Sequence, residues 1–360
     1  MAERWDRGTI DRNTVDRSTM TRGTGDPKPL ADPGAARRRA EQRETRVAAG
    51  VRELDSWLRD QVRQGLAASQ RAGYLHWDEI AARMVDAQAP GLAERLRALA
   101  AVPHSGPGWE GRLLEEYALL RLLAAACRDQ GRLPPRLADT VRSRVGFTVR
   151  QADLLARATP VRDQWHVLAR RDLDGDRIRT RRAWLLGRRT GRPALVLSFA
   201  AAGQPLDDSL LVGTETDADL AFYPGSVELR AVIAACHGTD PAGTDPAGTG
   251  PSGTVPAHVP VRPPPGTSVA GLLAGYAAAL AEDPWLDIWP AVLEAIPARA
   301  PLPCLRDADG GAIPLHGGAG DCWPLFALSG GRPLIVAGEW TPRGLWPLTA
   351  WDEDGRPVPL

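Results

Sequence analysis

Residues 51–92 read VRELDSWLRDQVRQGLAASQRAGYLHWDEIAARMVDAQAPGL, and this stretch decides the fold of the first part of the chain. Apolar residues recur at intervals of three to four positions, which is the spacing of one face of a helix. This first stripe comprises Val47, Val51, Leu54, Leu58, Val62 and Leu66. A second apolar face begins at Trp77, with Asp78 and Glu79 in the first turn, where the helix dipole favours acids. The pattern predicts a helical hairpin that ends at Ala89-Pro90-Gly91.

The same helical texture continues on both sides of the hairpin. Leucines at helical spacing and the run from Trp109 to Cys127 predict further helices, so we expect a helical module over residues 35–158. Residues 1–34 instead contain a five-residue repeat, WDRGT, IDRNT, VDRST and MTRGT, that has no apolar periodicity. A segment of this kind cannot bury a core, which predicts a disordered tail.

The pattern changes to strands after Pro160. Apolar and polar residues alternate on both sides of Asp174-Gly175, and Ala194 to Phe199 is an apolar run that follows the Thr190-Gly191 turn. This arrangement predicts an antiparallel meander. We expect an antiparallel β module over residues 159–236 that ends in a helix from Pro224-Gly225-Ser226 through Ala235.

A second five-residue repeat, GTDPA, GTDPA, GTGPS and GTVPA, occupies residues 238–257 and predicts a flexible linker over residues 237–266. Residues 267–360 then form a helix to Leu280, a short turn or helix around Trp285 to Trp289, and a C-terminal β module. We expect the stretch from Cys322 to Leu328 to be one of its strands. The fold class is therefore α+β: a helical N-terminal module followed by antiparallel β-meander modules with intervening helices.

An internal similarity links two distant segments. RAWLLGRRTGRPALVLSFA at 182–200 is similar to CWPLFALSGGRPLIVAGEW at 322–340. Both can be interpreted as strand, Gly-Arg-Pro turn and strand. The similarity therefore predicts either two β modules of one design or a chance match of two ordinary hairpins.

Composition excludes several classes of protein. The 360 residues contain no run of 18 apolar residues and no secretory signal at the start, so we expect a cytoplasmic protein without a membrane partner. Four scattered cysteines fit a reducing compartment. Lys28 is the only lysine, which excludes a phosphate-binding GxxxxGK[ST] loop and a Schiff-base lysine beyond it.

The sequence contains only incomplete motifs for a metal site or a catalytic site. Cys304, His316 and Cys322 have the spacing C-x11-H-x5-C, without the close ligand pair that zinc sites normally show, so two buried thiols and a loop histidine are the alternative. Asp172-Leu-Asp174-Gly-Asp176 lacks the glycine and glutamate positions of a calcium loop. His316-Gly317-Gly318 has no accompanying GxSxG nucleophile elbow. We therefore expect no catalytic residues, no metal ligands and no cofactor in this chain.

The charge is segregated along the chain. Residues 201–360 carry 7 arginines and 19 acids, whereas residues 1–200 carry 37 basic residues and 25 acids. Ten arginines lie between Val161 and Arg192, interleaved with Trp165 and Trp184, which could contact phosphates and bases. The candidate binding residues are Arg177, Arg179, Arg181, Arg182, Arg188 and Arg189. An internal contact with the acidic C-terminal half is the competing interpretation.

Seven landmarks carry a family resemblance: ELDSWLRDQVRQGL, HWDEIAARMVDAQAPGL, LLEEYALLRLL, VRDQWHVLARRD, RTRRAWLLG, ALVLSF and DADLAFYPG. From about Arg38 to its end, the chain resembles the C-terminal region of SWIM zinc-finger family proteins of actinobacteria. In that family a CxC…CxH motif precedes this region and binds the zinc, and this sequence contains no CxC. The resemblance implies a C-terminal part alone, without zinc ligands to carry over.

The resemblance and the composition lead to a ranked set of functions. We expect a non-catalytic accessory module that binds protein partners, among them a separately encoded SWIM finger segment. Nucleic-acid binding through the arginine-rich meander 161–192 is the alternative. An enzyme with an unrecognised site is a third and weaker one.

Overall fold

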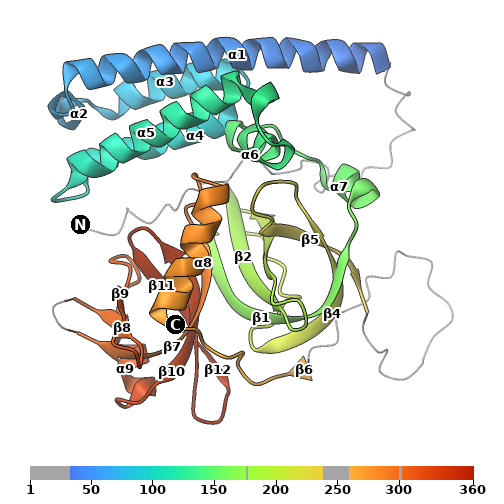
Figure 1. Ribbon diagram of the computed structural model, residues 1–360, viewed down its shortest axis with the longest axis vertical. Helices are drawn as coiled ribbons and strands as arrows, with labels where there is room; N and C mark the ends of the chain where they lie inside the picture. Colours follow the sequence, from blue (N-terminus) through green and yellow to red (C-terminus); the bar gives the residue numbers. More distant parts are fainter. Residues whose placement is uncertain (1–32, 176, 238–258, 300–301) are drawn as a thin grey trace. The chain divides into compact units, whose positions relative to one another are not determined.

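The computed structural model describes residues 33–175, 177–237, 259–299 and 302–360 (Figure 1). It has an α+β architecture, with an N-terminal helical region followed by two mostly antiparallel sheets with helices between them. The chain forms two compact units, of which the first takes in residues up to Gln151 together with Pro224–Ser226. The second unit takes in Ala152–Tyr223 and Val227–Leu360. The two segments with five-residue repeats, at 6–24 and 238–257, lie outside the described residues.

The first unit is helical. Its elements in chain order are α1 (Pro33–Gln64), α2 (Ala67–Arg71), α3 (Tyr74–Asp86), α4 (Pro90–Leu99), the 3-10 turn Val102–His104, α5 (Trp109–Arg128), the 3-10 turn Gln130–Arg132 and α6 (Pro135–Val145). The predicted hairpin is present as α1 and α3. Pro90 lies in the first turn of α4, where its missing N–H costs nothing.

The stripe on α1 is buried for most of its predicted length. Val47, Val51, Leu54 and Leu58 are at most 2% exposed, and they pack in a core with Trp77 of α3 and Tyr117 of α5. Val62 is 54% exposed, so the stripe leaves the core one turn before the helix ends. Gly50 allows the two helices of the hairpin to approach closely, because a Cβ there would collide with Ala87.

The second unit begins with a sheet that closes on itself. Its strands are β1 (Val161–Asp174), β2 (Ile178–Gly187), β3 (Pro193–Ala201), β4 (Thr214–Phe222), β5 (Arg230–Cys236) and the short β6 (Val259–Pro260). The predicted meander β1–β2–β3 is present and antiparallel. β3 pairs with β5 in parallel, β5 pairs with β4, and β4 returns to β1, so five strands form a closed ring. Closure removes the exposed edges of the sheet.

Alternation along these strands separates two cores. Trp165, Ala183 and Leu185 face the inside of the ring, while Trp184 faces the core of the second sheet. That second sheet has the order β12-β11-β10-β7-β8-β9. Its strands are β7 (Trp289–Ala298), β8 (Cys304–Arg306), β9 (Ala312–Pro314), β10 (Leu334–Thr341), β11 (Gly344–Trp351) and β12 (Pro357–Pro359). Three further helices complete the described fold: α7 (Gln151–Arg157), α8 (Val269–Glu282) and α9 (Trp323–Ser329).

Two expectations about local structure are wrong. The helix expected through Ala235 is strand β5, because its residues close the ring between β3 and β4. The strand expected from Cys322 is helix α9. The turn expected after α8 is present at Trp285, and β7 begins at Trp289. The similarity between 182–200 and 322–340 is therefore no repeat, since β2 in the first segment corresponds to α9 in the second.

Candidate functional site

The ten arginines between residues 161 and 192 were the main candidates for binding, and most of them form ion pairs within the second unit. Seven of the ten have a carboxylate partner beyond residue 200. The partners are Asp208, Glu215, Asp217, Glu228 and Glu339. The basic first half and the acidic second half of the chain therefore neutralise each other at these side chains.

Five of the six candidate binding arginines have a carboxylate partner, and for Arg181, Arg182 and Arg188 this partner lies beyond residue 200. Arg179 contacts Asp174 at 2.8 Å, Arg188 contacts Glu215 at 3.2 Å, and Arg189 contacts Asp163 at 3.4 Å. Arg177 is exposed, and its side chain has no hydrogen-bond or ion-pair partner among the described residues. The six arginines do not form one face, because strand alternation places Arg181 and Arg182 on opposite sides of β2.

Arg181 is the centre of a network at the ring of strands. Its Nε and one terminal nitrogen donate to the two carboxylate oxygens of Asp172, each at 2.7 Å, and its other nitrogen contacts Asp208. Hydrogen bonding by Arg181 lowers the pKa of Asp172 and of Asp208 and keeps both carboxylates charged. All three guanidinium nitrogens of Arg181 already donate to carboxylates, so few N–H donors are left for an external phosphate.

Arg182 faces the other side and reaches a buried carboxylate. Glu339 on β10 is fully buried, and it accepts hydrogen bonds from Arg171 at 2.9 Å, from Arg182 at 3.3 Å and from Trp184 Nε1 at 2.9 Å. The side chains of Arg171 and Arg182 are 9% and 7% exposed. One acid therefore links strands of both sheets. A buried charge of this kind is tolerated only when it is paired and hydrogen-bonded.

An aromatic stack extends the Glu339 network. The Arg171 guanidinium lies 3.7 Å from the centre of the Trp346 ring, and the His316 ring stacks on Trp346 at 4.4 Å. The backbone beside Glu339 is shaped for this packing, because a Cβ on Gly338 would collide with the carbonyl oxygen of Trp346. These contacts hold the buried charges in place.

Asp163 is a second buried acid with a structural role. Its side chain has no exposed surface, and it accepts hydrogen bonds from the amides of Gln164, Arg189 and Thr190 and from the Thr190 hydroxyl. Burial alone would raise the pKa of Asp163, but these hydrogen bonds outweigh it and lower the pKa. The carboxylate thereby fixes the turn between β2 and β3.

The metal candidates do not converge. His316 accepts a hydrogen bond at Nδ1 from the amide of Gly318 at 3.0 Å, and its ring is stacked on Trp346. Burial raises the pKa of the Cys322 thiol, which disfavours the thiolate that a metal would bind. Within the described ranges, no group of three or more His, Cys, Asp or Glu side chains is placed to hold a metal ion.

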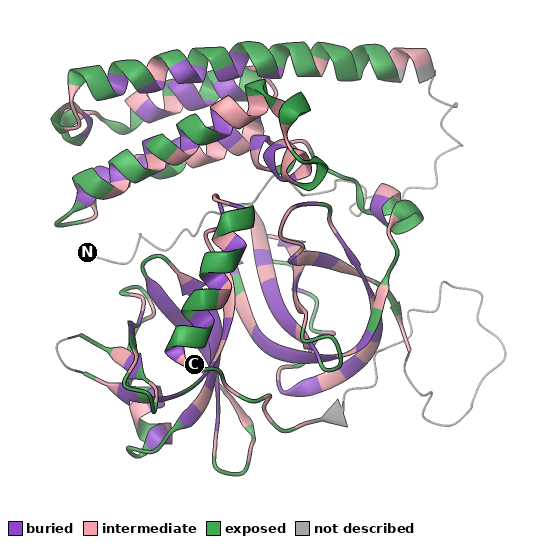
Figure 2. Cartoon of the chain, in the orientation of Figure 1, coloured by how far each residue is buried: buried purple, intermediate pink, exposed green. Residues whose placement is uncertain are grey.

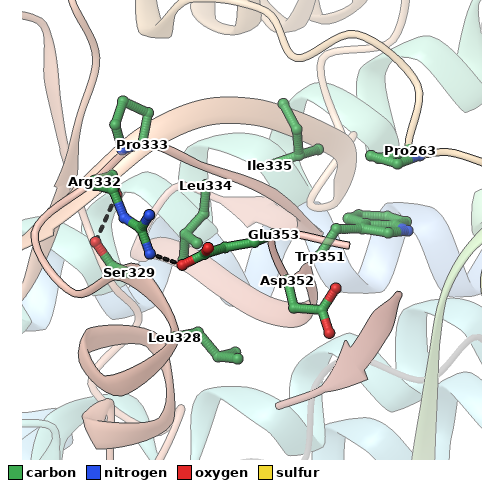
Figure 3. Close-up of a pocket in the computed structure, with 10 residues that line it drawn as sticks. All are labelled: Pro263, Leu328, Ser329, Arg332, Pro333, Leu334, Ile335, Trp351, Asp352 and Glu353. Atoms are coloured by element: carbon green, nitrogen blue, oxygen red, sulfur yellow. Dashed lines mark hydrogen bonds and ion pairs between the residues drawn. The ribbon is translucent and has the colours of Figure 1, made fainter. Parts of the chain in front are cut away.

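A shallow hollow of about 150 Å³ lies on the second sheet (Figure 3). Arg332 and Glu353 form an ion pair at its rim, and the Ser329 hydroxyl donates to the carbonyl oxygen of Arg332 at 2.6 Å. The other lining residues are Pro263, Leu328, Pro333, Leu334, Ile335, Trp351 and Asp352. The lining contains no histidine or cysteine. Its two carboxylates are already bonded, Glu353 to Arg332 and Asp352 to the backbone amides of the turn that follows it.

His166 is a buried histidine that the sequence did not single out. It is 4% exposed, its Nε2 atom has no hydrogen-bond partner in the described structure, and its ring lies edge-on to Trp351 at 6.1 Å. Burial lowers the pKa of His166 to about 4. The neutral imidazole is therefore part of the core rather than an accessible base.

Comparison with known proteins identifies the helical unit. Residues 42–145 match the SWIM-associated four-helix bundle domain, a range that runs from within α1 to the end of α6. Neither the curated proteins nor the solved structures contain a match to this chain. The expected resemblance to the SWIM family is thus shown for the helical domain alone. No helix in the described part of the chain is long and apolar enough to cross a membrane.

Proposed function

We propose that this chain is a non-catalytic accessory module whose helical domain binds a protein partner. The observation that carries the proposal is a group of exposed apolar side chains at one end of the helical unit. Val62 is 54% exposed, Tyr74 is 60% exposed and Leu75 is 74% exposed. We call these three residues the apolar end.

The three residues lie where two helices meet. Val62 lies in the last turn of α1, while Tyr74 and Leu75 open α3. A hydrogen bond of 3.0 Å between Gln61 and His76 joins the two helices at this level. Exposed apolar groups that cluster in this way mark interaction surfaces more often than isolated ones do.

The charged residues of the second unit, which we call the β unit, support the same conclusion. Most arginines of its meander are paired with internal carboxylates, so they have few free donors for recognition. The association of residues 42–145 with SWIM proteins suggests the partner. We propose a separate polypeptide that carries a CxC…CxH finger and contacts the apolar end.

Site-specific cross-linking tests the proposal. A photoreactive phenylalanine analogue at position 75 should yield an adduct with one protein, whereas the same analogue at the exposed Leu211 of the other unit should not. Leu75→Asp should then weaken binding of that purified protein at least about tenfold, as removal of an interface anchor does. The aspartate lies in the first turn of α3, where it leaves the helix intact. The absence of an adduct at position 75, or equal adducts at both positions, would refute the proposal.

A further inference from the structure

The excess positive charge of the helical unit is confined to one end. Residues 52–128 carry ten arginines and ten acids and are neutral. The flanking segments, 33–46 and 129–151, carry ten arginines and only four acids. The excess positive charge of the helical unit therefore lies in two segments that are about 100 residues apart in the sequence.

The fold brings these two segments together. Arg43 on α1 donates to the carbonyl oxygen of Gly146 at 2.9 Å, and Arg142 on α6 contacts Glu44 at 2.7 Å. The guanidinium groups of Arg43 and Arg142 lie 4.4 Å and 4.1 Å from the centre of the Phe147 ring. Burial, followed by the charge of Arg142, lowers the pKa of Arg43. This part of the surface thus holds like charges side by side.

Free arginines extend from this junction along α1. Arg37, Arg39 and Arg46 are exposed, and their side chains have no hydrogen-bond or ion-pair partner in the described part of the chain. Arg39 and Arg46 flank Arg43 at spacings of four and three residues, so the three lie on one side of the helix. Figure 2 shows that the first turns of α1 are largely exposed, and in Figure 1 they run beyond the other helices of the unit.

We infer that this basic end, comprising Arg37, Arg39, Arg43, Arg46 and Arg142, binds the phosphate backbone of a nucleic acid. Arginine guanidinium groups form paired hydrogen bonds with phosphate oxygens and are always charged. A rigid helix with exposed arginines can follow a groove of a duplex and neutralise several phosphates. Arg43 and Arg142 shape the site through Phe147. Arg39 and Arg46 lie on one side of α1 and Arg37 on the opposite side, so a helix in the groove presents them to the phosphates of both strands.

The affinity of the full chain for a 20-base-pair DNA duplex of mixed sequence, measured between 50 and 200 mM salt, tests this inference. Log affinity falls as log salt rises, and each neutralised phosphate makes this slope steeper by about 0.9. The triple variant Arg37→Gln, Arg39→Gln, Arg46→Gln should therefore have a slope that is shallower by about three. Between 50 and 200 mM salt, the unaltered chain should lose about 40 times more affinity than the variant loses.

A matched variant controls for total charge. Arg52, Arg71 and Arg157 are also exposed and without partners among the described residues, and their replacement by Gln should leave the slope unchanged. The inference is overturned if both triple variants lose the same amount, or if the unaltered chain does not bind duplex DNA at 50 mM salt. It is also overturned in favour of an acidic protein surface if polyglutamate binds more tightly than DNA or a matching RNA duplex. None of these results bears on the apolar end, which the cross-link at position 75 tests separately.

Discussion

Trp184 Nε1 donates a hydrogen bond of 2.9 Å to the carboxylate of Glu339, a residue 155 positions away that has no exposed surface. This bond joins β2 of the closed ring to β10 of the second sheet. The same carboxylate neutralises Arg171 and Arg182. We conclude that most arginines of the meander serve the fold of the second unit.

Replacement of Glu339 should strongly destabilise the β unit. Glu339→Ala leaves two arginines buried without their counter-charge, which costs about 3–5 kcal/mol in the free energy of unfolding. Guanidinium titration followed by tryptophan fluorescence measures the loss. Glu215→Gln is the matched control, because its partner Arg188 is 67% exposed and such a pair contributes about 1 kcal/mol or less. Equal losses in the two variants would contradict the role of Glu339.

The two neighbouring arginines of β2 should differ in their effect on stability. Arg181→Gln should cost about 1–2 kcal/mol, because a 12% exposed side chain loses two charged hydrogen bonds to Asp172. Arg179→Gln should cost about 0.5 kcal/mol or less, since its partner Asp174 is 79% exposed. Thermal unfolding of both variants checks this order. The reverse order would show that the Arg181 network does not stabilise the ring of strands.

Gly187 should not tolerate a side chain. A Cβ at this position would lie 2.7 Å from the Asp163 carboxylate and would collide with the Thr190 hydroxyl. Gly187→Ala should therefore disrupt the buried turn and lower the unfolding free energy by about 2 kcal/mol or more. Gly131→Ala is the control, because its Cβ would meet nothing within 4 Å. A neutral Gly187→Ala variant would show that the Asp163 hydrogen bonds contribute little.

The stability of the β unit should fall in mild acid because of His166. Its folded pKa is about 4, below the ordinary value of 6.5, so the unfolded chain binds more protons between these pH values. Stability is therefore retained above pH 6.5 and lost progressively as the pH falls towards 4, by about 3 kcal/mol.

The pH dependence has its own control. His166→Phe should flatten the unfolding free energy between pH 6.5 and pH 4, whereas replacement of the exposed His104 should not. The pKa values of Asp163 and Asp172 are lowered from 3.8, so these carboxylates affect stability mainly below that pH. They therefore leave the range between pH 6.5 and pH 4 to His166. An unchanged slope in His166→Phe would mean that the imidazole is hydrated or paired in solution.

Regular patterns were sufficient to predict the elements with strong local signals. The spacing of Val47, Val51, Leu54 and Leu58 predicted α1, and the turn at Asp174-Gly175 predicted the pairing of β1 with β2. Helix α9 had a usable signal that was missed: Pro324 lies in its first turn and Gly330 follows its last residue with a positive φ of 51°.

Other features depend on partners that are remote in the sequence. β5 contains Val232 and Ile233, which suit a strand, but its place is set by pairing with β3 and β4. The role of Glu339 depends on arginines 157 and 168 residues away. The alternation along a strand can indicate which side chains face inward. It cannot indicate which distant residue supplies the opposite charge for a buried arginine.

The affinity for duplex DNA as a function of salt, compared for three forms of the full chain, tests the central claim most directly. We predict that the unaltered chain and Arg179→Gln/Arg181→Gln share one slope of log affinity against log salt. The variant Arg37→Gln/Arg39→Gln/Arg46→Gln should have a slope lower by about three. A slope reduced in the β-strand variant and retained in the α1 variant would contradict the account, because the free charge would then lie on the meander.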